Sequence, residues 1–154
     1  MAPRPTDHPT DLVQLHIPLD DPEIGCECVW AAAVGPDRYR IANVPFFAHD
    51  VGIHDVVLAL EAESCLELVD VLERRSVASF NYELRTGVDE PVFFADSRGT
   101  GAATERLGRS CFTTDLHHEP AADRFEQLLS PHARWYERFD ALGRLVREAG
   151  DVTS

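Results

Sequence analysis

Two His-Asp pairs, His49-Asp50 and His54-Asp55, lie within the stretch "NVPFFAHDVGIHDVV", residues 43–57. An imidazole beside a carboxylate can act as a general acid or base, and both groups are ligands of divalent metals. Histidines five positions apart do not share a helical face, so a third group would have to complete a metal or general-base site. We take His54 and Asp55 as catalytic candidates.

The same stretch also suits a structural corner. The side chain of Asn43 can bond main-chain groups in a turn, and Pro45 fixes φ where regular pairing stops. Phe46 and Phe47 would then bury apolar area and close one end of a small β domain. This interpretation needs no ligand, and it places both phenylalanines in the core.

A second group of chemically capable side chains is His117, His118 and Glu119, where a predicted strand gives way to a predicted helix. Two imidazoles and a carboxylate could bind a divalent ion or carry protons. The alternative is a solvated turn, because adjacent histidines in a strand point to opposite faces. The candidate catalytic residues of an enzyme are therefore His54, Asp55, His117, His118 and Glu119.

The four cysteines include one close pair, Cys26 and Cys28. In a strand these two side chains share a face and could offer two thiolates to a soft metal. Zinc needs about two more ligands, and no second cysteine pair follows. We therefore expect four free thiols, and neither a metal nor a cofactor.

The charge balance constrains the partners. Asp and Glu number 27 against 14 Lys and Arg, a formal net charge of -13, which repels nucleic acid and anionic membranes and favours a basic protein partner. Acidic residues concentrate between positions 61 and 73, and we expect Glu61, Glu63 and Glu67 to form the recognition surface. The start of the chain has no apolar signal region and no later run could span a bilayer, so we expect a cytoplasmic protein.

Turn residues and apolar periodicity divide the chain into parts. Three prolines predict a flexible leader over residues 1–10. Short alternating runs separated by turns predict a β-rich, barrel-like subdomain over residues 11–86, including a strand near 78–84. Residues 87–150 are expected to form an α/β subdomain, followed by a tail, 151–154.

Within the second part we expect a short helix near residues 101–107 and a strand over 109–116. Phe125, Leu128 and Leu129 recur at helical spacing after Pro120, which predicts a helix there. A further helix is expected over residues 130–150, with Ser130 as its cap, Gly150 as its stop and an apolar stripe between them. The fold class that follows is α+β.

The run "ECVWAAAVGPDRYRIANVPFFAHDVGIHDVV", from Glu27 to Val57, resembles the bacterial domain-of-unknown-function family 4265. That family shows a Glu-x-x-Trp-Ala strand, a Gly-x-Tyr-x-Leu strand leading into Asn-Ile-Pro-Phe-Phe-Ala, and a Gly-Asp-Val-Val turn and strand. The matching residues are Glu27, Trp30, Ala31, Tyr39, Asn43, Val44, Pro45, Phe46, Phe47, Ala48, Asp55, Val56 and Val57.

Two departures from the family pattern matter. His54 stands where members usually have Gly, and since His tolerates positive φ better than most residues, we expect His54 to adopt the left-handed conformation. "RSVASF", from Arg75 to Phe80, replaces a Ser-Gly-His-Ser-Thr-like stretch that held the family's polar catalytic candidate. The resemblance implies a β-rich first half and a second half resembling a ferredoxin-like unit, and it implies no activity.

Two functional hypotheses follow. The first is a small, non-catalytic acidic binding protein, such as an immunity or accessory factor, that engages a basic protein. The second is a small enzyme of specialised metabolism that holds a small molecule between its two halves and uses His and carboxylate groups as acid and base. Convergence of the catalytic candidates on one cavity would favour the enzyme.

Overall fold

The structure is a computed structural model that describes residues 12–150, so the predicted leader, 1–10, and tail, 151–154, lie outside it. The chain is α+β, as expected, and mostly β. Its elements are β1 (Leu12–Pro18), β2 (Cys26–Gly35), β3 (Arg38–Ile41), β4 (Val56–Ala62), β5 (Cys65–Glu73), β6 (Ala78–Leu84), α1 (Glu90–Gly99), β7 (Ala103–Arg106), β8 (Cys111–Leu116), α2 (Glu119–Leu129), β9 (Ala133–Asp140) and β10 (Leu145–Gly150).

The first five strands form one sheet, which we call the closed sheet. Neighbouring strands pair in antiparallel fashion in chain order, and β1 returns to β5 through a parallel pairing of His16 with Glu67. Alternate residues of each strand point inward, as the period of a strand requires. The enclosed core is apolar and includes Leu15, Ile17, Val29, Ala31, Ile41, Val57 and Ala59.

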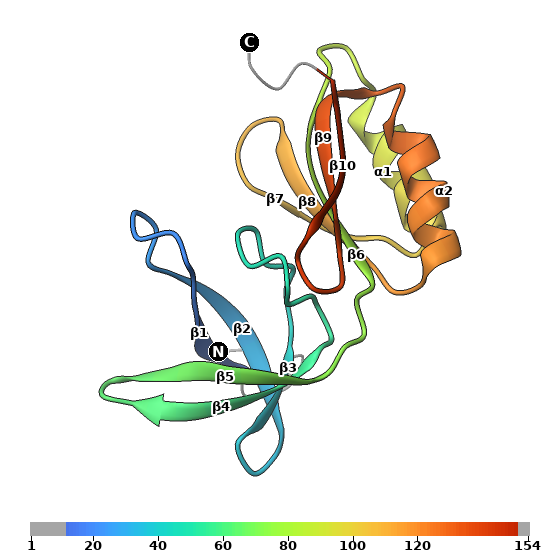
Figure 1. Ribbon diagram of the computed structural model, residues 1–154. Helices are drawn as coiled ribbons and strands as arrows, with labels where there is room; N and C mark the ends of the chain where they lie inside the picture. The colour runs from blue at the N-terminus through green and yellow to red at the C-terminus, as the bar shows by residue number, and fades with distance from the viewer. Residues whose placement is uncertain (1–11, 151–154) are drawn as a thin grey trace, which may run out of the picture.

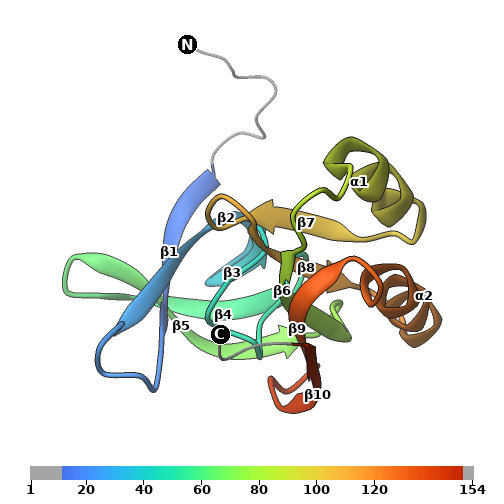
Figure 2. The same ribbon diagram turned by 90° about the horizontal axis from the view of Figure 1, so that it is seen from above.

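The last five strands form a second sheet, which we call the open sheet, in the order β10-β9-β6-β8-β7. Figure 1 shows both helices on one face of this sheet and the closed sheet beyond the other. Phe80 and Tyr82 of β6 pack against Phe125 of α2 and Phe93 of α1. Figure 2 shows the closed sheet, the open sheet and the two helices from above.

The helix predicted after Pro120 is confirmed as α2, but the helix predicted over residues 130–150 is wrong. Those residues form the antiparallel hairpin of β9 and β10. Ser130 ends α2 instead of starting a new helix, and Gly143 turns the hairpin with a φ of 82°. Tertiary contacts override the helical spacing, because Tyr136 and Arg138 on one face of β9 bond to α2.

Two further expectations need correction. The short helix expected near residues 101–107 is wrong, because Ala103–Arg106 form strand β7. The helix of this segment is α1, which begins earlier, where Asp89 accepts a 3.2 Å hydrogen bond from the N–H of Val92 as its N-cap. The strand expected near 78–84 exists as β6 but belongs to the open sheet, where it pairs with β8 and β9. Within residues 12–150, neither helix is long and apolar enough to cross a membrane.

Candidate functional site

The loop between β3 and β4, which we call the 42–55 loop, is held by hydrogen bonds to both sheets. Glu27 of β2 accepts hydrogen bonds from three consecutive main-chain N–H groups of this loop, those of Phe46 (2.6 Å), Phe47 (2.8 Å) and Ala48 (3.0 Å). The side chain of Asn43 accepts a 2.7 Å bond from the N–H of Trp30, so it bonds to the main chain as expected, but to strand β2 and not within its own turn. The conformation of the loop is therefore set by the closed sheet.

Asp55, a predicted catalytic residue, is only 1% exposed and is occupied by main-chain donors. Its carboxylate accepts bonds from the N–H groups of Gly52 (2.9 Å), Arg75 (2.6 Å) and Ser76 (3.0 Å). These bonds tie the end of the 42–55 loop to the segment that leads from β5 into β6. In this arrangement Asp55 holds the chain, and the small cavity that it lines, of about 10 Å³, is too small for a substrate.

Asp115 on β8 is a second buried carboxyl group, and our sequence analysis did not single it out. It is 1% exposed and accepts a 2.7 Å hydrogen bond from the N–H of Ile53. Burial raises its pKa to about 8, with a further contribution from the charge of Asp55, although the bond from Ile53 acts in the opposite direction. The raised pKa favours the protonated form of Asp115, which joins the open sheet to the 42–55 loop.

His54 and His117 do come together. His54 has a φ of 73°, which confirms the expected left-handed conformation, and its ring centroid lies 5.2 Å from that of His117. The pKa of His54 is lowered by burial and by the nearby charges of His117 and Arg40. Among residues 12–150, Nε2 of His117 has no hydrogen-bond partner.

His118 and Glu119 have structural roles at the start of α2. His118 is the N-cap, and its Nδ1 accepts a 3.4 Å hydrogen bond from the N–H of Ala121. Glu119 pairs with Arg138 of β9 at 3.0 Å. The five predicted catalytic residues thus divide among separate structural tasks, with only His54 and His117 in mutual contact.

A groove of about 500 Å³ opens between the two sheets, and we call it the aspartate groove. It is lined by Pro18, Leu19, Asp20, Asp21, Ile24, Phe47, Ala48, His49, Asp50, Leu142 and Gly143. Asp20, Asp21 and Asp50 are exposed, and none of the lining residues is Lys or Arg. Large apolar side chains are also exposed there, Ile24 by 42%, Phe47 by 45% and Leu142 by 53%.

The exposure of Phe47 corrects our expectation that it belongs to the core. Phe46 is half-buried, whereas Phe47 lines the aspartate groove with nearly half of its surface open. The N–H groups of both residues are held by Glu27, so the loop presents Phe47 outward without being loose. The stretch therefore combines a structural corner with one wall of a groove.

The walls of the aspartate groove are fixed to one another. Arg74 donates hydrogen bonds to the carbonyl of Asp50 (2.6 Å) and to that of Ala141 (2.8 Å), which joins the 42–55 loop to the β9–β10 hairpin. The ring of His49 stacks on Phe139 at a centroid distance of 3.7 Å, and burial lowers the pKa of His49. The groove is therefore preformed.

The predicted recognition surface lies on the β4–β5 hairpin. Glu61 and Glu63 are exposed, Glu67 is half-buried, and Glu63 turns the hairpin with a φ of 53°. Figures 1 and 2 both show the tip of this hairpin projecting from the side of the closed sheet, as a convex feature. Exposed apolar side chains accompany the acids, with Leu60 at 44%, Val69 at 54% and Leu72 at 41%.

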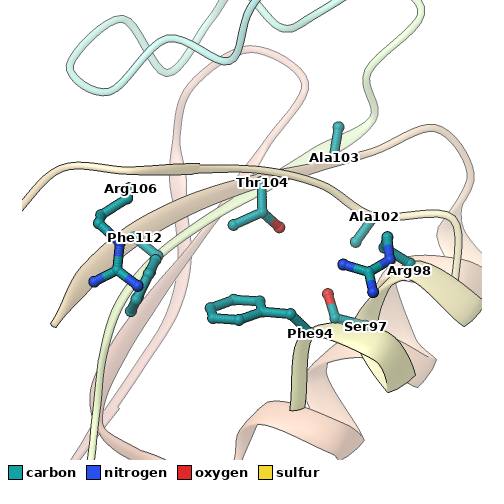
Figure 3. Close-up of a pocket in the computed structure, with 8 residues that line it drawn as sticks. All are labelled: Phe94, Ser97, Arg98, Ala102, Ala103, Thr104, Arg106 and Phe112. Carbon is teal, nitrogen blue, oxygen red and sulfur yellow. The ribbon is translucent and has the colours of Figure 1, made fainter. Parts of the chain in front are cut away.

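A separate pocket of about 540 Å³ lies between α1 and the edge strand β7, and we call it the arginine pocket. Figure 3 shows Phe94, Ser97 and Arg98 on the helix side and Thr104 pointing toward them from the strand side, where Ala102 and Ala103 also lie. Arg106 completes the lining with its guanidinium over Phe112, 4.6 Å from the ring centroid.

The polar groups of the arginine pocket continue into the core. The hydroxyl of Thr104 lies 2.8 Å from that of Thr114, which lies 2.9 Å from the hydroxyl of Tyr82. Burial raises the pKa of Tyr82 to about 12, so its hydroxyl stays protonated. The hydroxyls of Tyr82, Thr114 and Thr104 can therefore donate to one another in a single direction. The pocket thus offers the cation of Arg98 and a fixed hydroxyl above an apolar floor, whereas the guanidinium of Arg106 is already paired with Glu90 at 2.8 Å.

Comparisons with known proteins bear on the fold alone. No family model matches the chain, and no curated protein matches it. A crystal structure of a hypothetical protein from Neisseria gonorrhoeae is similar, with a TM-score of 0.67 and 13% sequence identity over 88% of this chain and 99% of that one. This chain therefore shares its two-sheet arrangement with a solved structure whose description assigns no activity.

Proposed function

We propose that this protein is a small binding protein that receives a basic protein partner in the aspartate groove. The observation that carries the proposal is the joint exposure of three aspartates and three large apolar side chains in one preformed concave site. An arginine or lysine of the partner would meet the carboxylates, while its aliphatic stem would cover Ile24, Phe47 and Leu142. The role would be that of an immunity or accessory factor.

The distribution of charge supports this assignment. Residues 12–76 contain twelve Asp and Glu but four Arg, whereas residues 77–150 contain twelve Asp and Glu and nine Arg. The negative potential is therefore concentrated on the half that supplies most of the groove. Glu61, Glu63 and Glu67 would attract the partner over a distance, and the groove would make the contacts. The same charge disfavours nucleic acid and anionic membranes as partners, and we place this activity in the cytoplasm.

The alternative hypothesis of an acid-base enzyme has less support. Asp55 is occupied by three main-chain donors, His118 caps α2, and Glu119 pairs with Arg138. An enzyme built on the groove would have to use His49 and its neighbouring aspartates instead. The ring of His49 is stacked on Phe139, which suits a wall better than a group that must move protons.

Site-specific photo-crosslinking tests the proposal. A photoreactive phenylalanine analogue in place of Ile24 should capture a basic protein in cells that express the chain, and Asp20→Asn with Asp50→Asn should abolish the capture. The matched control carries the analogue in place of Val92 on α1, which is 55% exposed and outside the groove. Equal capture from both positions, or capture that survives both Asn substitutions, would contradict the proposal.

The arginine pocket supports a second candidate function, the binding of a small anion with an apolar body. Arg98 brings a positive charge to this pocket in a chain of net charge -13, and guanidinium groups recognise carboxylate and phosphate. Arg106 also lines the pocket but is paired with Glu90. A panel of small aryl carboxylates and phosphates should raise the melting temperature, and Arg98→Gln should remove that effect. The control is Arg124→Gln on α2, where the same charge is lost away from the pocket.

We also infer that the closed sheet is a small barrel and that residues 77–150 form a ferredoxin-like unit. The return of β1 to β5 supports the first inference. The order β-α-β-β-α-β with β9-β6-β8-β7 as spatial neighbours supports the second, with β10 as an added edge strand. The resemblance to family 4265 remains a proposal, supported by the quoted residues between Glu27 and Val57.

A further inference from the structure

The outer surface of the closed sheet carries a side-chain cluster that the proposed function does not use. It consists of His16 on β1 and Cys26 and Cys28 on β2. The antiparallel pairing sets His16 opposite Cys28 and Pro18 opposite Cys26, so the imidazole lies beside both thiols. The side chains alternate with the inward-facing Leu15, Ile17 and Val29, which places all three members of the cluster on the outside.

The nitrogen–sulfur distances within the cluster fit a tetrahedral metal site, and Sγ of Cys28 lies equally near both ring nitrogens of His16, at 3.6 Å. Nδ1 of His16 lies 3.6 Å from Sγ of Cys26 and 3.6 Å from Sγ of Cys28. Zinc bonds of about 2.3 Å to sulfur and about 2.0–2.1 Å to nitrogen, at the tetrahedral angle, require a sulfur–nitrogen separation of about 3.6 Å. One ligand atom from each of the three residues lies within 4.8 Å of the others.

We propose that His16, Cys26 and Cys28 form a three-ligand site for a thiophilic divalent cation of the zinc type, with a fourth, exchangeable position. Two sulfurs and an imidazole select this class of metal over magnesium or calcium, which prefer oxygen ligands. Both thiols are exposed, so the metal can enter without unfolding the sheet. The strands hold the three ligands at their positions before the metal arrives.

The neighbouring strand β5 offers groups near the fourth position. Its parallel pairing sets Glu67 beside His16, on the side opposite Cys28. Cys65 precedes Glu67 by two positions, so the two side chains share the outer surface of the strand. Water would fill the fourth position of the proposed site, and Glu67 and Cys65 lie on the strand next to His16.

A thiol must lose its proton before its sulfur can bind a metal. Binding of one cation by the two thiols therefore releases up to two protons, and the affinity falls as the pH is lowered.

The missing second cysteine pair, which predicts metal-free thiols, does not exclude a site whose third ligand is His16. The third ligand comes from a different strand, ten positions before Cys26, and only the register of β1 with β2 brings it into place. The sequence signal for this site is a strand that carries a histidine, followed by a hairpin turn and a strand with a Cys-x-Cys pair.

Cobalt(II) titration of the reduced full-length protein under anaerobic conditions tests the site. One equivalent should produce a thiolate-to-cobalt charge-transfer band and the intense visible bands of a tetrahedral ion, and zinc should displace it. A dissociation constant below about 1 μM is expected, which corresponds to about 8 kcal/mol. Protons released into a weakly buffered solution should accompany the binding.

Variants decide whether the assigned residues are the ligands. Loss of a metal's outer-shell partner alone weakens binding about 10- to 100-fold, so Cys28→Ser and His16→Gln should each weaken it at least tenfold. Cys111→Ser, on β8 of the open sheet, is the matched control and should leave the titration unchanged. The proposal is overturned if no tetrahedral thiolate spectrum forms, or if Cys28→Ser and Cys111→Ser bind cobalt equally well.

Discussion

Asp115 of the open sheet accepts a 2.7 Å hydrogen bond from the main-chain N–H of Ile53, 62 positions earlier in the chain. The neighbouring N–H, that of Gly52, donates to a different buried carboxylate, Asp55. Two consecutive main-chain groups of the 42–55 loop are thus held by both halves of the molecule. This connection fixes one wall of the aspartate groove.

Asp115 should make the protein less stable as the pH rises. Its folded-state pKa of about 8 exceeds its ordinary value of 3.8, so the folded state holds a proton that the unfolded state releases between these values. The contribution to the unfolding free energy is therefore complete below about pH 4 and is lost as the pH rises to about 8. Asp115→Asn cannot titrate but can still accept the bond from Ile53.

Urea unfolding at pH 5 and pH 8.5 checks this prediction. The unfolding free energy of Asp115→Asn, measured relative to the unsubstituted protein, should increase between the two pH values. A difference that stays constant would show that Asp115 is ionised in the folded state.

Glu126 should have the opposite effect, at lower pH. Burial acts to raise its pKa, but hydrogen bonds from Arg147, Tyr136 and Arg138 prevail and lower it to about 2. A depressed folded-state pKa stabilises the protein above the ordinary value of 4.5, and the contribution is lost as the pH falls toward 2. Glu126→Gln should therefore reduce the loss of unfolding free energy between pH 5 and pH 2.5, measured by urea midpoints.

Gly52 should tolerate no side chain. A Cβ at this position would lie 2.3 Å from Cβ of Ser76 and 2.6 Å from its Oγ, closer than atoms can pack. Gly52→Ala should lower the unfolding free energy by about 1 to 3 kcal/mol, because the loop must shift against the buried Ser76. Gly99→Ala, where an added Cβ would meet nothing within 4 Å, is the control and should cost far less in the same denaturation assay.

Phe46 and Phe47 should differ although they are adjacent. Phe46 is half-buried, so Phe46→Ala should lower the unfolding free energy by about 1 to 3 kcal/mol. Phe47 is 45% exposed, so Phe47→Ala should change it by about 0.5 kcal/mol or less while weakening capture of the partner. Equal destabilisation by both substitutions would assign Phe47 to the core.

Much of the fold could be predicted from local patterns, and the failures have identifiable causes. Alternation revealed the strands, and Pro120 with Phe125 and Leu129 revealed α2. Trp135 and Phe139 are four positions apart, a spacing that fits one face of a helix and equally one face of a strand. The contacts of Arg138 with α2, which decide between the two, join residues that only the folded chain brings together.

The candidate sites were harder to predict than the fold. The aspartate groove combines the β1–β2 turn, the 42–55 loop and the β9–β10 hairpin, three segments with no common motif. Its composition depends on how the two sheets meet, through bonds such as those of Arg74 to Asp50 and Ala141. Conversely, two of the predicted catalytic residues have structural roles. Asp55 accepts hydrogen bonds from three main-chain N–H groups, and His118 caps α2.

Kinetics of the captured partner test the central claim most directly, because the groove and the β4–β5 hairpin have different assigned roles. Two double variants remove two negative charges each, Asp20→Asn with Asp50→Asn in the groove, and Glu61→Gln with Glu63→Gln on the hairpin. Both would be measured at low and at physiological ionic strength, where charges are screened beyond about 8 Å.

We expect the groove variant to raise the dissociation rate and to weaken binding by about 2 kcal/mol or more, since contact charges lose a partner. The hairpin variant should lower the association rate and its salt dependence, and leave the dissociation rate nearly unchanged. If the two variants instead lower the association rate equally and neither changes the dissociation rate, the aspartate groove is not the contact site and the account is wrong.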